Sequence, residues 1–302
     1  MQRLIIVYNP LSSRFSDVKK DVLDKIQTLN GYLVGKYEVE KTNLEDNINK
    51  FSKLVKDDDI IIAAGGDATG IIASNGILRS CKDATLAVLP YGNFNDLSHT
   101  LGTKTFEDVF SKNAARGKLY PLEIIIDGKL FRYATCYATI GMTAEAVELY
   151  NKPKMRRKLK KSFGRQVSSY TELASWYFKH RHKKQFIPEF KLNGVLQHKK
   201  TSDYAAINGR SMARVMKGRE DYKKPKVFRS ETDRLASFWR LFKLMFKSIL
   251  FRIPGSDTTS DTLEFLNPAI VAIQTEGECK LFKDIKKIEI KKGEKCLKII
   301  KI

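Results

Sequence analysis

The stretch IIIAAGGDATG, residues 60–70, decides the fold of this chain. Its apolar half is typical of a buried parallel strand, and the glycines at 65 and 66 end that strand before an apolar helix. Glycines at such a junction let backbone N–H groups approach an anion, and the helix N-terminus adds a partial positive charge. The stretch therefore predicts either a phosphate site or a tight turn in which Asp67 caps the next helix.

Strand and helix patterns alternate on both sides of this stretch, over the first 120 residues. Strands are expected at 3–8, 37–42, 59–64 and 85–90, and helices at 16–30, 44–55, 69–78, 94–101 and 105–114. This alternation predicts a doubly wound parallel sheet with right-handed crossovers. Such sheets bind ligands at the carboxyl ends of their strands, where NPLSSR (9–14), GGDATG (65–70) and PYGNFND (90–96) lie.

Short β segments with glycine turns replace the alternation after residue 121. EIIIDGKLFRYATCYA (123–138) predicts a hairpin around Asp127-Gly128, and helices are expected at roughly 143–150, 165–180 and 233–250. The predicted fold class is α/β, with an N-terminal doubly wound parallel-sheet domain at 1–120 and a C-terminal antiparallel β-sandwich domain with inserted helices at 121–290. The final strand, about 291–302, is free to return to the first domain.

The bulk composition narrows the class of protein. Of the 302 residues 42% are hydrophobic, enough for a core, and the net charge of +21 predicts an anionic partner: phosphate, nucleic acid or an acidic membrane surface. No run approaches the roughly 18 apolar residues of a membrane span. The apolar run at the N-terminus is too short for a signal peptide, so we expect a cytoplasmic protein.

One basic segment predicts where the positive charge acts. Residues 152–165, KPKMRRKLKKSFGR, hold eight Lys or Arg and no acidic residue. Near an anionic leaflet each such residue contributes on the order of 1 kcal/mol to binding. The residues expected to bind the membrane are Arg156, Arg157, Lys158, Lys160 and Lys161. We therefore expect a protein held peripherally at the inner face of the membrane.

Five features, taken in order, resemble the diacylglycerol kinase catalytic family, which includes sphingosine and bacterial lipid kinases and has a NAD kinase-like N-terminal domain. The family patterns NPxSG, GGDGT and PxGTxND are similar to NPLSS (9–13), GGDAT (65–69) and PYGNFND (90–96) here. Thr42 stands where the family has a Thr ending its second strand. Glu276-Gly277-Glu278 matches the family's late Asp-Gly-Glu turn, so the resemblance covers nearly the whole chain.

The resemblance implies an ATP- and Mg²⁺-dependent lipid kinase, with diacylglycerol as the default acceptor. It implies that the nucleotide lies against one set of loop residues: Asn9, Pro10, Ser12, Ser13, Thr42, Gly65, Gly66, Asp67, Ala68, Thr69, Gly92, Asn93, Asn95 and Asp96. Asp67 and Asp96 would hold the metal. Asp67 and Glu278 would be catalytic, with Glu278 the general base for the lipid hydroxyl.

Departures from the family patterns leave an alternative open. Ala68 replaces the fourth residue of GGDGT, a glycine, and its methyl group could crowd the phosphates or refuse a positive φ. Asn93 replaces the Thr of the third pattern. The alternative is a diverged or inactive kinase-fold protein that binds anionic lipid or nucleic acid through its basic surface. Nucleic acid is the less favoured partner because no recognition motif for it is present. The sequence leaves the acceptor lipid and an oligomer open.

Overall fold

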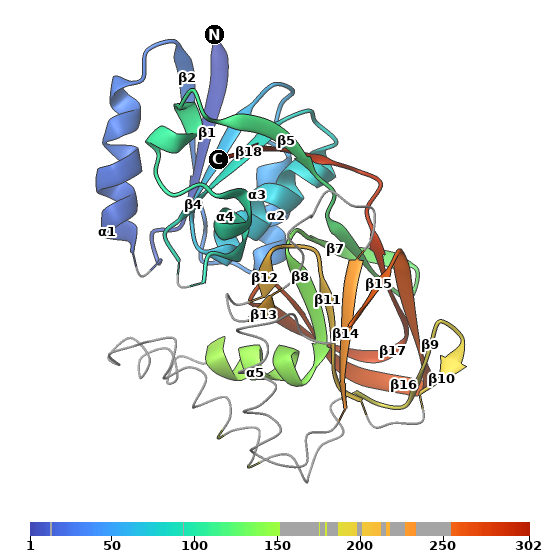
Figure 1. Ribbon diagram of the computed structural model, residues 1–302. Helices are drawn as coiled ribbons and strands as arrows, with labels where there is room; N and C mark the ends of the chain where they lie inside the picture. Colours follow the sequence, from blue (N-terminus) through green and yellow to red (C-terminus); the bar gives the residue numbers. More distant parts are fainter. Residues whose placement is uncertain are drawn as a thin grey trace.

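The computed structural model describes residues 1–12, 14–92, 94–151, 175, 179, 187–197, 201–212, 216–217, 227–233 and 255–302. Figure 1 shows two lobes, each built on one large sheet. The first lobe contains a six-stranded, mainly parallel sheet with its helices, and the second contains a ten-stranded antiparallel sheet. The predicted α/β class, with a parallel N-terminal and an antiparallel C-terminal part, is confirmed.

The sheet of the first lobe has the strand order β2-β1-β3-β4-β18-β5. The bounds are β1 Gln2–Tyr8, β2 Tyr32–Glu38, β3 Ile60–Gly65, β4 Thr85–Pro90, β5 Ala115–Leu119 and β18 Leu297–Lys301. All neighbours pair in parallel except β5, which is antiparallel to β18. The chain passes from β1 to β2 on one side and then to β3 on the other. The crevice beyond the carboxyl ends of β1 and β3 is therefore the topological switch point, where such sheets bind ligands.

Helices cover both faces of this sheet. A helical segment of α1 (Phe15–Val18), η1 (Lys19–Leu23) and η2 (Lys25–Thr28) lies on one face, and α2 (Leu44–Ser52) and α3 (Asp67–Ser80) lie on the other. Two short helices, α4 (Asp96–Leu101) and η3 (Glu107–Phe110), follow β4. Along β1, Leu4 and Ile6 pack with the α1 segment while Ile5 and Val7 pack with α2 and α3. Successive side chains of a strand point to opposite faces of the sheet, so the apolar residues of β1 pack against the helices on both faces.

Two strands of the first lobe differ from the sequence prediction. The second strand was expected at 37–42 but is Tyr32–Glu38, because its pairing with β1 begins directly after the turn at Gly31, whose φ is +87°. Thr42 consequently lies in the loop beyond the strand and does not end it. β5 was not predicted, since its sequence ARGKL has no apolar alternation and its strand form depends on pairing with β18.

The second lobe contains the long hairpin of β16 (Ser260–Thr275) and β17 (Glu278–Lys292). Its other strands are β6 Leu122–Ile126, β7 Lys129–Ala134, β8 Tyr137–Gly141, β9 Phe190–Leu192, β10 Val195–Leu196, β11 Thr201–Ile207, β14 Val227–Asp233 and β15 Ser256–Thr258, with β12 Ser211–Met212 and β13 Met216–Lys217 as a separate pair. The hairpin predicted at Asp127-Gly128 joins β6 to β7, and the helix predicted at 143–150 is α5, Met142–Asn151. The helices predicted at 165–180 and 233–250 lie outside the described residues, apart from Ser175, Lys179 and Asp233, the last residue of β14.

The two lobes share one buried core. Tyr133, Cys136, Tyr137 and Ile207 of the second lobe belong to the same apolar cluster as the side chains of α2 and α3. The chain also returns to the first sheet through β18. The lobes are thus joined by continuous apolar packing.

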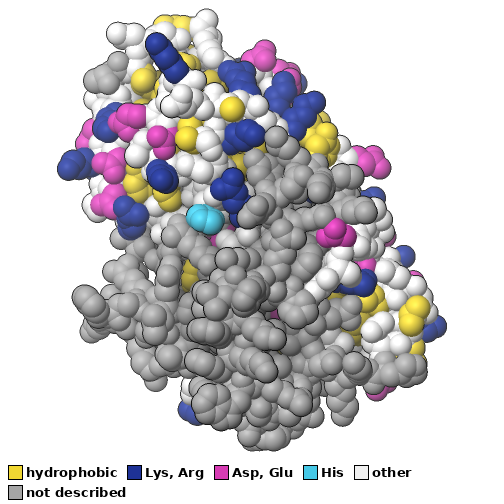
Figure 2. Space-filling view, in the orientation of Figure 1, with side chains coloured by type: hydrophobic (Ala, Val, Ile, Leu, Met, Phe, Trp, Pro, Cys, Tyr) yellow, Lys and Arg dark blue, Asp and Glu magenta, His cyan; other side chains and the backbone are white. Residues whose placement is uncertain are grey.

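The described surface carries both signs of charge. On the face in Figure 2, Lys and Arg of the first lobe are interleaved with Asp and Glu. Among the described residues, no helix is long and apolar enough to span a bilayer. All four cysteines are free, and only Cys136 is fully buried.

Candidate active site

The loops that follow β1, β3 and β4 contact one another at the rim of the first sheet. The backbone N–H of Tyr91 donates to the carbonyl oxygen of Gly65 at 3.0 Å, which joins the loops after β3 and β4. Arg14 Nη1 donates to the carbonyl oxygen of Pro90 at 3.1 Å, which joins the loop after β1 to the same place. The three loops therefore form one continuous rim at the switch point.

Two glycines bring the second and third loops into backbone contact. A Cβ built on Gly92 would lie 2.3 Å from the Cα of Gly66, closer than any side chain can be. Gly66 is also the N-cap of α3, so this contact lies at the positive end of a 14-residue helix. The rim therefore has no side chain between Gly66 and Gly92 beside the helix N-terminus, the kind of place where proteins bind phosphate.

Asp67 fastens the third loop to the second. Its Oδ2 accepts from the N–H of Asn95 at 3.1 Å and its Oδ1 from the N–H of Asp96 at 2.9 Å. Asn95 has a left-handed backbone with φ 56°, and its Oδ1 accepts from the N–H of Gly92 at 2.6 Å. Asp67, the first residue of α3, therefore caps the N-terminus of α4.

An acidic turn of the second lobe joins β16 to β17. Glu276 and Gly277 both have positive φ, 49° and 86°, which is the two-residue hairpin turn of type I′. Glu276 is only 3% exposed. Its Oε1 accepts from Thr135 Oγ1 at 2.5 Å and from the N–H of Cys136. The turn is thereby held against the segment between β7 and β8.

The acidic turn and the first-lobe rim lie near the same buried groups. Burial raises the pKa of Glu276 to about 7; hydrogen bonds from Thr135 and Cys136 oppose this shift, and the charge of Asp67 adds to it. Burial also raises the pKa values of Cys136 and Tyr137, and the charges of Asp67, Asp96 and Glu276 raise both further. Three carboxylates from the two lobes thus act on the same buried groups.

Glu278, the predicted base, begins β17 and pairs with Thr275 across the turn. It is half-buried. Burial raises the pKa of the neighbouring Cys279 to about 12, and the charges of Glu148, Glu145 and Glu278 contribute to that shift. Glu145 and Glu148 belong to α5, so Glu278 lies at the border between the acidic turn and α5.

The remaining predicted residues are distributed along the same rim. Asn9 Oδ1 accepts from the N–H of Leu11 at 2.8 Å and shapes the loop after β1, and Thr69 is buried in the first turn of α3. Thr42 Oγ1 accepts from Asn47 Nδ2 at 3.0 Å, in the loop before α2. Ser13, Asn93 and the predicted membrane-binding residues Arg156, Arg157, Lys158, Lys160 and Lys161 lie outside the described residues.

Part of this chain is similar in sequence to a known protein family. The family model for the diacylglycerol kinase catalytic domain matches residues 3–125, which include all three rim loops. Residues 3–125 are therefore similar to the diacylglycerol kinase catalytic domain. The acidic turn and the rest of the second lobe lie beyond the matched segment.

Characterised relatives match over part of their length. The chain is 30% identical to the diacylglycerol kinase of Staphylococcus saprophyticus over 133 residues, which are 43% of this chain and 39% of the relative. It is 32% identical to the diacylglycerol kinase of Bacillus subtilis over 136 residues (43% and 44%), and 31% identical to the human mitochondrial acylglycerol kinase over 97 residues (29% and 23%). The chain thus spans less than half of the length of each of these relatives.

A solved structure supports the fold of the whole chain. The crystal structure of a diacylglycerol kinase from Bacillus anthracis str. Sterne matches with a TM-score of 0.63 at 14% identity, over 100% of this chain and 97% of that chain. A second solved chain from the same organism matches with a TM-score of 0.67 at 16% identity, over the same shares. Both lobes, and not only the catalytic domain, therefore have the fold of these proteins.

The first-lobe rim and the acidic turn offer carboxylate oxygens, which are ligands that suit Mg²⁺. The carboxylates of Asp67, Asp96 and Glu276 create a negative potential that raises the pKa of Tyr137, and a divalent cation would offset that potential. No group of three potential ligands is arranged to hold a metal among the described residues. Mg²⁺ keeps waters and phosphate oxygens as most of its ligands and takes one or two carboxylates.

Sequence reasoning missed several of these groups. From sequence, Glu276 is part of the turn and an alternative base, with no sign that it is buried, and no role in the site is predicted for Thr135, Cys136 and Tyr137. The signal available was the pair of acids in TEGE (275–278), one on each side of the glycine. Glu276 lies in the two-residue turn and is buried, whereas Glu278 follows the turn as the first residue of β17 and is half-buried.

Glu276 should give the stability of the protein a pH dependence. In the unfolded chain its carboxyl ionises near pH 4.5, whereas in the folded protein its pKa is about 7. Between these values the folded state binds more protons, so stability falls as pH rises, by up to about 1.4 kcal/mol per pH unit for this one group. Glu276→Gln stays neutral and should flatten the fall in Tm between pH 5 and 7.

A second buried carboxyl group, that of Asp203, limits how far Glu276→Gln can flatten the fall in Tm. Burial raises its pKa to about 7 as well, so it keeps part of the slope in the Glu276→Gln variant. Melting curves of the two proteins from pH 4.5 to 7.5 provide the measurement. Parallel curves would show that Glu276 is already ionised in the folded state.

Ala68→Gly should lower stability without improving ATP binding. Ala68 is the second residue of α3 and does not have a positive φ, so its methyl group causes no backbone strain. Glycine in place of alanine in a helix costs about 0.5–1 kcal/mol. We expect that loss in urea unfolding, with the KM for ATP within twofold of the wild-type value. A clearly lower KM would mean that the methyl group crowds the phosphates.

Proposed function

We propose that this chain is an ATP- and Mg²⁺-dependent lipid kinase that transfers the γ-phosphate of ATP to a hydroxyl group of a membrane lipid, with diacylglycerol as the default acceptor. One series of contacts carries the proposal. Asp67 caps α4, and Thr100 of α4 contacts Cys136 of the other lobe. The N–H of Cys136 donates to Glu276 in the acidic turn. A kinase of this kind needs phosphate-binding loops and a carboxylate base on opposite sides of one site.

The first lobe supplies the nucleotide side. The N-terminus of α3, which Gly66 caps, suits the phosphates, since its first N–H groups have no partner within the helix and neither Gly66 nor Gly92 places a side chain beside them. Asp67 and Asp96 are the residues that would hold Mg²⁺, which, when bound, neutralises phosphate charge. Asp67 also keeps the loop after β4 in place through its two backbone hydrogen bonds.

The second lobe supplies the acceptor side. The lipid hydroxyl oxygen forms a bond to the γ-phosphorus while the bond from that phosphorus to the β–γ bridging oxygen breaks, and ADP leaves. The hydroxyl proton passes to the carboxylate of Glu278, which acts as the general base. Most of the rate enhancement in such a transfer comes from in-line positioning and charge neutralisation. The rigid turn that holds Glu278 suits this requirement.

The acceptor places the enzyme at a lipid surface. We propose that the segment with Arg156, Arg157, Lys158, Lys160 and Lys161 attracts the anionic inner face of the membrane, on the strength of eight basic residues in fourteen. This would bring the acidic turn to a substrate that does not leave the bilayer. Peripheral attachment is therefore part of the proposal.

The test is phosphate transfer from labelled ATP to lipid. The purified chain is incubated with Mg²⁺ and vesicles of phosphatidylcholine and phosphatidylglycerol, with and without diacylglycerol. Label that appears in lipid only when diacylglycerol is present supports the proposal. A non-catalytic binding protein would give no label and no stabilisation by Mg-ATP, whereas a nucleotide site should give about 2.7 kcal/mol at 100 times its Kd.

A further inference from the structure

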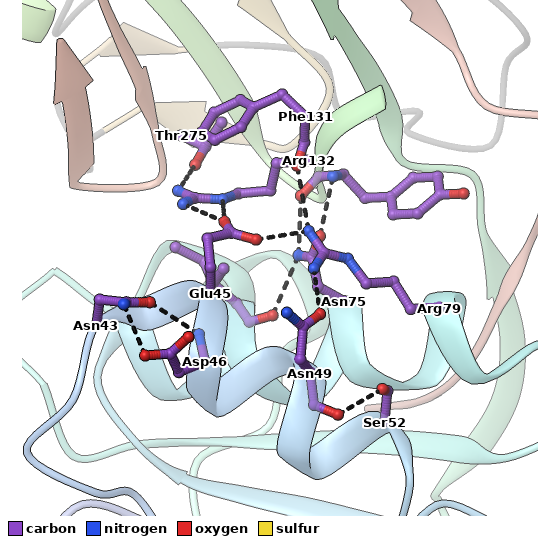
Figure 3. Close-up of polar contacts among 12 residues, drawn as sticks. Asn43, Glu45, Asp46, Asn49, Ser52, Asn75, Arg79, Phe131, Arg132 and Thr275 are labelled. Carbon is purple, nitrogen blue, oxygen red and sulfur yellow. Dashed lines mark hydrogen bonds and ion pairs between the residues drawn. The ribbon is translucent and has the colours of Figure 1, made fainter. Parts of the chain in front are cut away.

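A buried arginine links the two lobes beside the acidic turn. Arg132 lies on β7 and is only 4% exposed. Its Nε and Nη2 donate to Glu45 Oε1, at 3.0 and 2.7 Å, and its Nη1 donates to Thr275 Oγ1 at 2.9 Å. Glu45 belongs to α2 of the first lobe, and Thr275 is the last residue of β16, directly before Glu276. Figure 3 shows Arg132 between these two partners.

The partner of this arginine is held firmly in its ionised form. Burial alone would raise the pKa of Glu45, but hydrogen bonds and charges from Arg132 and Arg79 outweigh burial and lower it. Arg79 of α3 donates to Glu45 Oε2 at 2.7 Å and to the carbonyl oxygen of Phe131 at 3.1 Å. A carboxylate shared by two guanidinium groups gives Arg132 a fixed anchor in the first lobe.

A second contact fixes the same strand to the helix that begins with Asp67. Asn75 of α3 is fully buried, and its side chain bonds both backbone groups of Tyr133: Nδ2 donates to the carbonyl oxygen at 3.0 Å, and Oδ1 accepts from the N–H at 2.9 Å. These bonds fix the position of β7 relative to α3 at Tyr133, and Arg132 connects β7 to the end of β16.

We infer that Arg132 is a positioning residue that holds the acidic turn, and with it Glu278, at a fixed distance from the phosphate-binding rim. This inference rests on the proposed kinase function. Glu45 fixes the orientation of the planar guanidinium group of Arg132. Its Nη1 can therefore donate to Thr275 Oγ1 only when Thr275 is in one position. Thr275 is fully buried and pairs with Glu278, so a shift of its backbone is passed directly to the base.

Two substitutions break the link at different points. Thr275→Val removes the hydroxyl acceptor at nearly constant shape, and Arg132→Lys keeps the charge but offers one compact ammonium group in place of the fork. Each should lower kcat by roughly tenfold or more, as expected for a misplaced catalytic group, with the KM for ATP within twofold. Thr275→Ser restores the acceptor and should restore kcat. The kcat of the double variant should be no lower than that of the less active single variant, because both changes remove the same interaction.

Hydrogen exchange gives a readout that does not depend on activity. Backbone amides of 275–280 should exchange about tenfold faster in Thr275→Val and Arg132→Lys than in the wild type, while those of α3 stay unchanged. Asn49→Ala is the matched control, since it removes the contact from Arg79 Nη1 to Asn49 Oδ1 in the same cluster and leaves the turn untouched. This control should change neither kcat nor exchange at 275–280.

The outcomes separate this inference from the proposed function. Unchanged exchange at 275–280 in both variants overturns the positioning role, whatever the kinetics. Equal losses in kcat for Thr275→Val and Thr275→Ser overturn it as well, because the hydroxyl would then be irrelevant. If the wild type transfers no phosphate but exchange at the turn rises as expected, the proposed kinase function fails and the positioning of the turn by Arg132 stands.

Discussion

Glu278→Ala is expected to lower kcat for lipid phosphorylation by about two to four orders of magnitude, with little change in the KM for ATP. The substitution removes the carboxylate that accepts the proton of the attacking hydroxyl. It leaves the phosphate-binding rim of the first lobe intact, so ATP should bind as before. Steady-state kinetics with diacylglycerol vesicles provide the measurement, and Glu278→Gln should show the same loss with a side chain of equal size.

Glu145→Gln is the matched control for this prediction. Glu145 lies on α5, and its charge reaches Cys279 as that of Glu278 does, but it has no part in the proposed transfer. Its kcat should remain within twofold of the wild-type value. A loss of less than tenfold in Glu278→Ala would contradict the assignment and move the role of base to Glu276 or Asp67.

Asp67→Asn should lower kcat/KM by at least about 100-fold, a size typical of losing one electrostatic contact to the reacting groups. The change removes the negative charge that would hold Mg²⁺. It also replaces one of the two acceptor oxygens with an NH2 group, which cannot accept the hydrogen bond that this oxygen receives from Asn95 or Asp96. The loop after β4 should therefore loosen as the metal affinity falls. Kinetics over a Mg²⁺ titration measure both effects.

A second consequence distinguishes the loss of charge from a general loss of structure. The charge of Asp67 contributes to the raised pKa of Glu276, so Asp67→Asn should move the pH dependence of stability to lower pH. Asp46→Asn, in the first turn of α2, is the control and should leave kcat/KM unchanged. Undiminished kcat/KM in Asp67→Asn would exclude this residue from the site.

The fold was largely predictable because its signals are local. The buried runs of β1, β3 and β4 and the glycines at 65 and 66 are strong patterns, and each was placed within one or two residues. β2 and β5 were misplaced or missed because partner strands decide them: pairing with β1 sets the start of β2, and β18 makes a strand of ARGKL. The sequence of a single segment does not show which distant segment it will pair with.

The candidate site, too, has parts that the sequence predicts and parts that it does not. The loops that carry Asp67 and Asn95 are found from their sequences, since a phosphate site needs glycines and a following helix. The burial of Glu276 and the bridge from Glu45 through Arg132 to Thr275 are not, because they depend on how two lobes meet. Sequence separations of 87 and 143 residues join the members of that bridge. Such contacts become visible only in three dimensions.

The position of β18 has a consequence for synthesis on the ribosome. This strand lies between β4 and β5, its residues Leu297 and Ile299 are fully buried, and the backbone of Ile302 bonds to Leu101. The matched segment 3–125 is therefore complete in the nascent chain long before its sheet can close. Until the last residues emerge, β4 presents an open edge, the kind of surface on which other chains aggregate. An isolated fragment ending near residue 125 would keep that open edge permanently, so the catalytic domain should be expressed with the second lobe attached.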